Sequence, residues 1–103
     1  MKPRDCVLTL VFPDALEEEI IGHLLEHPEW VVGFTCARVD GHGQAVRLHG
    51  SAEQVRGRSR RLQVQIALNR EDAQALTVHL RQTLPNPEIA YWVLPLLEFG
   101  RFA

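Results

Sequence analysis

Residues 60–68, RRLQVQIAL, carry the clearest secondary-structure signal in the chain. From Leu62 onward, apolar residues alternate with Gln63, Gln65 and Ala67. Successive side chains of a strand point to opposite faces of a sheet, so this period of two predicts a strand with one face on a core and one polar face.

The segment before this strand, residues 41–57, reads GHGQAVRLHGSAEQVRG and is polar, basic and punctuated by glycine. An irregular segment longer than about 12–15 residues in a compact domain is usually either functional or disordered. We expect a disordered insertion with glycine hinges at Gly41, Gly43 and Gly57. A binding site of defined geometry is expected at the arginines at the start of the following strand, because the sheet would position their side chains.

Outward from this centre, the pattern alternates between strand and helix. Asp14 with Glu17, and Asn69 with Asp72, are residue pairs that typically mark a helix start. Proline residues end both helices. The predicted elements are a strand at 6–12, a helix at 14–27, strands at 32–40 and 60–68, a helix at 69–84 and a strand at 88–94.

This order predicts an α+β fold, a ferredoxin-like βαββαβ sandwich with both helices on one face of a four-stranded antiparallel sheet. A chain of 103 residues with 46% hydrophobic content suits one core, so residues 1–103 are assigned to a single domain. The other sheet face would carry Thr35, Gln63, Gln65 and residues near Trp92. Such an uncovered face suits association, and we expect an oligomer.

Composition narrows the classes of partner. The formal net charge of −2 argues against bulk affinity for nucleic acid or membranes. RNA-binding domains of this topology stack bases on sheet aromatics, whereas the corresponding positions here hold Gln63 and Gln65. No apolar run approaches the ~18 residues of a membrane span. We expect a cytoplasmic protein without membrane insertion, with Cys6 and Cys36 as buried reduced thiols.

Five motifs along the chain carry a family resemblance: LTLVFP at 8–13, GFT at 33–35, VDGHG at 39–43, VRGRSRR at 55–61 and YWVLPLLEFGR at 91–101. Together they resemble a proteobacterial family of uncharacterised PII-like proteins in the nitrogen-regulatory PII superfamily. The resemblance implies a ferredoxin-like subunit that assembles into a homotrimer around its sheets. It also implies that residues 41–57 form a T-loop, the arm that changes shape with ligand and engages partners.

The same resemblance implies an association with heavy-metal efflux, since genes of the family often lie near heavy-metal efflux systems. A membrane transporter or a regulatory protein is therefore the expected partner. The chain departs from nitrogen-regulatory PII proteins at residues 84–87, LPNP, where those proteins have a glycine-rich nucleotide-binding loop. Prolines supply no amide donors for phosphate, so the sequence argues against the classical ATP site. The absence of tyrosine from the central segment argues against uridylylation.

Five arginines are candidates for a small-anion site at a subunit junction, because guanidinium groups hold phosphate or carboxylate with paired hydrogen bonds. Arg58, Arg60 and Arg61 come from the basic run itself. Arg38 and Arg101 are added because the resemblance implies that strand two and the C-terminus approach the inter-subunit cleft. The alternative is a solvated basic strand end.

The histidines offer a metal hypothesis. His42 and His49 are the candidate ligands for a divalent metal such as Zn²⁺ or Cu²⁺, and the alternative is a pair of solvated loop side chains. His23 and His27, four residues apart, fall on the solvent side of the first helix's apolar stripe. We expect His79 to be exposed or at a boundary.

Three functional hypotheses remain. The preferred one is a non-catalytic PII-like regulatory trimer that responds to a small ligand, and the second is a metal-binding accessory protein of a heavy-metal efflux system. The third is a small ferredoxin-like enzyme with His79 as its acid–base group. No nucleophile and base converge in the predicted fold, so catalysis is not expected.

Tyr91 and Trp92 point to opposite faces of the last strand, one expected in the core and one at an interface.

Overall fold

The structure is a computed structural model that describes residues 2–43 and 59–103. Most of the predicted insertion lies outside the described residues, and so do Gly57, Arg58 and His49. The predictions made for them remain predictions.

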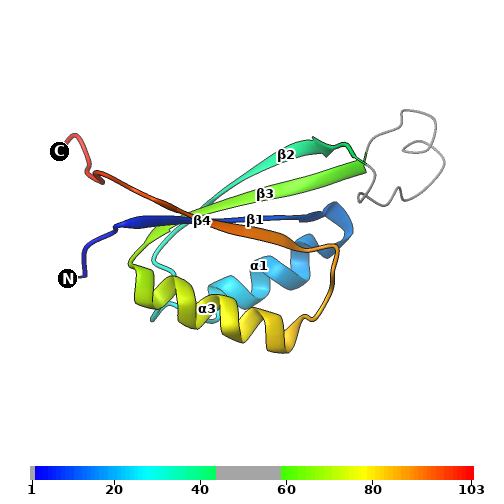
Figure 1. Ribbon diagram of the computed structural model, residues 1–103, viewed down its shortest axis with the longest axis horizontal. Coiled ribbons are helices and arrows are strands. Elements are labelled where there is room, and N and C mark those ends of the chain that lie inside the picture. Colours follow the sequence, from blue (N-terminus) through cyan, green and yellow to red (C-terminus); the bar gives the residue numbers. More distant parts are fainter. Residues whose placement is uncertain (1, 44–58) are drawn as a thin grey trace.

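The elements are β1 (Cys6–Pro13), η1 (Asp14–Leu16), α1 (Glu17–Leu25), β2 (Thr35–Gly41), β3 (Ser59–Leu68), α3 (Arg70–Thr83) and β4 (Ala90–Pro95). The strands form a four-stranded sheet in the order β2-β3-β1-β4, and each neighbouring pair is antiparallel. Both helices cover the same side of this sheet (Figure 1). The predicted ferredoxin-like α+β fold is confirmed.

The core lies between the helices and the two central strands. β3 contributes the residues that the period of two assigned to the core, and alternate residues of β1 lie beside them. The helices complete the core with apolar residues at helical spacing. The buried side chains are Cys6, Leu8, Leu10, Phe12, Ile20, Leu24, Val31, Leu62, Val64, Ile66, Leu68, Ala73, Leu76 and Leu80.

The two helix starts differ. At α3 the Asn69 side chain accepts a hydrogen bond of 2.9 Å from the amide of Asp72, which confirms the predicted cap. At α1 the predicted cap by Asp14 is wrong, because η1 begins directly after Pro13 and Asp14 lies inside the first turn, with no side-chain cap bond. The acidic residues Glu17, Glu18 and Glu19 still suit the positive end of α1.

Both edge strands are exposed, which corrects two predictions. Cys6 is buried as expected, but Cys36 is exposed because β2 lies at the sheet edge. In β4, Tyr91 and Trp92 are 43% and 42% exposed, so neither belongs to the core. Alternation along the strand still places them on opposite faces.

The sheet face away from the helices has a regular cross-strand row. Thr9 of β1 lies opposite Gln65 and Trp92, and Gln65 lies opposite Thr35. Thr9 is only 1% exposed, although no helix covers this face (Figure 1). The register agrees with the predicted placement of Thr35, Gln63 and Gln65 on this face, and Trp92 lies there too. Within the described part of the chain, no helix is long and apolar enough to cross a membrane.

Candidate functional site

Four of the predicted arginines are among the described residues, and they lie at separate places within one chain: Arg38, Arg60, Arg61 and Arg101. Arg38 projects from the helix-facing side of β2 and its Nη2 lies 3.5 Å from Oε1 of Glu17. Both partners are largely exposed, so this ion pair contributes little to stability. Arg60 lies opposite Asp40 in the β2–β3 register.

Arg61 is buried, with only 6% of its surface exposed. Its Nη1 donates a hydrogen bond of 3.0 Å to the carbonyl oxygen of Glu88, which precedes β4. Its aliphatic part lies over Gly41, where an added Cβ would come within 2.9 Å of Arg61 Cδ. Arg61 therefore connects β3 with β2 and with the segment before β4, and its Nε is buried without a hydrogen-bond partner among the described residues.

Arg101 lies near the other end of the sheet. The Arg101 guanidinium carbon is 5.9 Å from the centre of the Phe99 ring, and that of Arg4 is 4.3 Å from the same centre. These residues border a surface hollow of about 460 Å³ that also includes Thr35 and Gln65. The described chain thus has a second basic region that the sequence analysis recognised only through Arg101.

Among the predicted hinge glycines and metal ligands, the structure describes Gly41, His42 and Gly43. Gly43 has a φ of +127°, a conformation that favours glycine, whereas Gly41 has no positive φ. His42 between them is exposed. Among residues 2–43 and 59–103, no group of three or more histidine, cysteine, aspartate or glutamate side chains is arranged to hold a metal ion.

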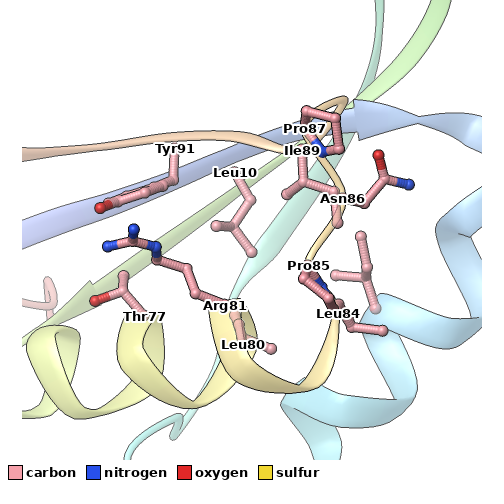
Figure 2. A pocket seen from close by; sticks show the side chains of 11 residues that line it. Leu10, Thr77, Leu80, Arg81, Leu84, Pro85, Asn86, Pro87, Ile89 and Tyr91 are labelled. Atoms are coloured by element: carbon pink, nitrogen blue, oxygen red, sulfur yellow. The ribbon is translucent and has the colours of Figure 1, made fainter.

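A better-formed cavity lies between the sheet and the end of α3. It has a volume of about 370 Å³ and an apolar lining that includes Leu10, Ile20, Leu80, Leu84 and Ile89. The segment from residue 85 to 87, which connects α3 to β4, borders one side (Figure 2). Prolines in this segment prevent α3 from continuing, so the chain turns away and leaves space above the helix end.

Four polar side chains also line this cavity: Thr77, Arg81, Asn86 and Tyr91. Thr77 and Arg81, one turn apart on α3, point toward the strand that carries Tyr91 (Figure 2). The Arg81 side chain makes no hydrogen bond or ion pair within the described residues. An apolar cavity beside an unpaired guanidinium suits a ligand with a hydrocarbon or ring portion and an anionic group.

The sequence analysis missed this cavity. Arg81 and Tyr91 lie in different elements, and no motif links them. The available signal is the pair of prolines at residues 85 and 87, which predict the end of a helix and argue against a phosphate-binding loop but do not by themselves indicate a cavity.

A histidine cluster, which consists of His23, His27 and His79 with Trp30, lies between α1 and α3. His27 Nε2 is 3.1 Å from His79 Nε2, and the His27 ring stacks on Trp30 at 4.9 Å between centres. The prediction that His27 faces solvent is wrong, because its side chain is only 20% exposed and packs against the second helix. His79 is half-buried, in agreement with the predicted boundary position.

Comparison with known proteins gives the family. No curated protein shows significant sequence similarity to the chain. The solved structure of a DUF3240 family protein from Shewanella baltica OS155 matches with a TM-score of 0.75 and 17% identity, over 100% of each chain. CPII, a nitrogen regulatory PII-like protein from Thiomonas intermedia K12 bound to ADP, AMP and bicarbonate, has a TM-score of 0.68 and 17% identity, over 94% of this chain and 93% of CPII.

CutA from Pyrococcus horikoshii has a TM-score of 0.69 and 9% identity, over 92% of this chain and 87% of CutA. At such low identities these likenesses describe the fold, which is PII-like. The model of the family described as "Protein of unknown function (DUF3240)" matches residues 3–103. The resemblance found in the sequence is thus confirmed, and the chain belongs to the DUF3240 family, which shares its fold with PII-like proteins.

Proposed function

We propose that this protein is a non-catalytic, cytoplasmic PII-like regulatory subunit that forms a homotrimer. Its ligand is a small carboxylate with an apolar portion, bound in the cavity between α3 and β4. The observation that carries the ligand proposal is the apolar cavity of about 370 Å³ with the Arg81 guanidinium beside it, a group that has no partner among residues 2–43 and 59–103.

The ligand class follows from the lining. The apolar side chains favour burial of a hydrocarbon or ring, which releases water from both surfaces. The guanidinium of Arg81 would hold the carboxylate with two parallel hydrogen bonds, and the Tyr91 hydroxyl lies on the same side of the cavity (Figure 2). A mostly apolar pocket with a few polar groups that fix orientation is the usual form of a small-molecule site.

Nucleotides are the natural comparison, because the PII-like protein from Thiomonas intermedia was solved with ADP and AMP. The segment at residues 85–87 has prolines at both ends, so two of its three residues lack an amide donor. A cradle for a polyphosphate needs several such donors. We therefore propose a carboxylate in preference to a nucleotide.

Regulation would follow from population shift. A ligand that binds one conformation more tightly increases the population of that conformation. By analogy with PII proteins, the segment at residues 41–57 would engage a transporter or a regulatory protein. This part of the proposal rests on the family resemblance, and limited proteolysis of residues 41–57 with and without ligand would test it.

Calorimetric titration of the full chain tests the ligand site. The panel would contain aliphatic and aromatic carboxylates together with AMP, ADP and ATP. Arg81→Gln should weaken carboxylate binding by about tenfold or more, because a hydrogen bond to a charged group typically contributes about 1.5–3 kcal/mol. The matched control is Arg38→Gln, an exposed arginine outside the cavity, which should leave the affinity unchanged.

Two outcomes would count against the proposal. One is that no carboxylate in the panel binds. The other is that Arg81→Gln and Arg38→Gln have the same effect on affinity, because a general loss of positive charge would then explain the result.

A further inference from the structure

The histidine cluster contains two imidazole nitrogens that converge from distant parts of the chain. His27 follows the last turn of α1, and His79 lies in the second half of α3. Their Nε2 atoms are 3.1 Å apart. The two residues are 52 positions apart in sequence, so the packing of α1 against α3 creates the pair.

Glu29 determines which nitrogen of His27 is free to accept. The other ring nitrogen, Nδ1, lies 3.1 Å from Oε2 of Glu29. An ionised carboxylate only accepts hydrogen bonds, so Nδ1 carries the proton and Nε2 of neutral His27 has a lone pair directed at His79.

We propose that His27 and His79 form a two-histidine site for a divalent transition metal, with Zn²⁺ as the reference ion. Zn–N bonds are typically about 2.0–2.1 Å long. For two nitrogens 3.1 Å apart, metal–nitrogen bonds of that length give an N–metal–N angle of roughly 100°. Four- to six-coordinate metals commonly adopt such angles. His79 would carry its remaining proton on Nδ1 when Nε2 binds the ion.

The carboxylate of Glu29 acts on the metal through His27. Histidine ligands usually donate their second ring N–H to a carboxylate or carbonyl oxygen, which fixes the ring and makes the ligating nitrogen more basic. Here that arrangement exists before any metal binds. Trp30 stacks on the His27 ring and limits its rotation further.

The site is open enough to exchange its ion. His79 and Trp30 border a surface groove, so one side of the pair faces solvent. With two imidazoles as protein ligands, water would complete the coordination. Imidazole favours Zn²⁺, Cu²⁺ and Ni²⁺ over Mg²⁺ and Ca²⁺.

Zn²⁺ titration of untagged full-length protein, followed by calorimetry, tests the site. His27→Gln and His79→Gln should each weaken binding by more than tenfold, because each removes one of two protein ligands. Glu29→Gln should weaken binding by about tenfold, in line with other changes of carboxylates that orient a histidine ligand. The Glu29 side chain is 54% exposed, so this variant keeps the test valid if a histidine variant folds poorly.

Controls separate this site from the other proposals. The double variant His42→Ala, His49→Ala removes the ligands predicted from the sequence and should leave Zn²⁺ affinity unchanged. Arg81→Gln should also have no effect on Zn²⁺ binding. Electron paramagnetic resonance of the Cu²⁺-loaded protein should show nitrogen coupling that changes in His79→Gln. Unchanged Zn²⁺ affinity in His27→Gln, His79→Gln and Glu29→Gln would overturn the proposal.

Discussion

Among the described glycines, Gly41 has the least room for a side chain. A Cβ there would lie 2.9 Å from both Cδ and Nε of Arg61. The Arg61 side chain cannot move freely, because it is buried and donates to the Glu88 carbonyl. Gly41→Ala should therefore lower the free energy of unfolding by about 1–3 kcal/mol, the usual range for overpacking.

Urea denaturation of Gly41→Ala and Gly33→Ala would check this. An added Cβ at Gly33 meets no atom within 4 Å, and Gly33 has no positive φ. The control should be neutral or slightly more stable, because alanine reduces the conformational entropy of the unfolded chain. Equal effects of the two substitutions would show that Arg61 is not held in place.

Single residues were predictable where their environment follows from local pattern. Leu62 and Val64 were assigned to the core from a period of two, and they are buried. The surroundings of Arg61 were not predictable, because its contacts with Gly41 and Glu88 join segments far apart in sequence. The burial of Cys36 was predicted wrongly because the pattern within a strand does not show whether that strand lies at a sheet edge.

At the scale of the element, the two helix starts make a matched pair. Asn69→Ala removes the hydrogen bond to the Asp72 amide and should cost about 1 kcal/mol of stability. Asp14 makes no cap bond, so Asp14→Ala should cost clearly less. Thermal unfolding followed by circular dichroism would measure both. A larger loss for Asp14→Ala would contradict the assignment of the caps.

Each helix was found from its own apolar stripe, but the stripe alone did not show how the helices face each other. His23 and His27 fell on the polar side of α1 in that description. In the structure this side reaches α3, where His79 contacts His27. The cavity beside Arg81 escaped prediction for the same reason, because it depends on how α3, β1 and β4 are arranged in space.

At the scale of the whole molecule, the order of elements was sufficient to predict the fold. Two βαβ halves leave few compact arrangements, since connections are short and sequential elements pack together. The order also predicted that one sheet face would lack helices, as it does (Figure 1).

The proposed homotrimer makes a prediction about this face. Trp92 and Leu94 of β4 are 42% and 53% exposed, and alternation places them on the side away from the helices. Neighbouring exposed apolar side chains of this size are typical of interfaces. Trp92→Glu with Leu94→Glu should convert the protein from a trimer to a monomer, because charge at the centre of an apolar interface must be desolvated without a partner.

Sedimentation velocity at micromolar concentration would measure the assembly state of the unaltered chain and of the Trp92→Glu, Leu94→Glu variant. Val78→Glu is the matched control, because Val78 is 49% exposed but belongs to α3 on the covered side of the sheet. That variant should remain a trimer. If the unaltered chain sediments as a monomer, or if Val78→Glu dissociates it as fully as the double substitution, the sheet face is not the contact between subunits. If the Trp92→Glu, Leu94→Glu variant is a monomer, calorimetric titration of that variant tests a further point. Binding of the cavity ligand to the monomer would show that one chain supplies the whole binding site.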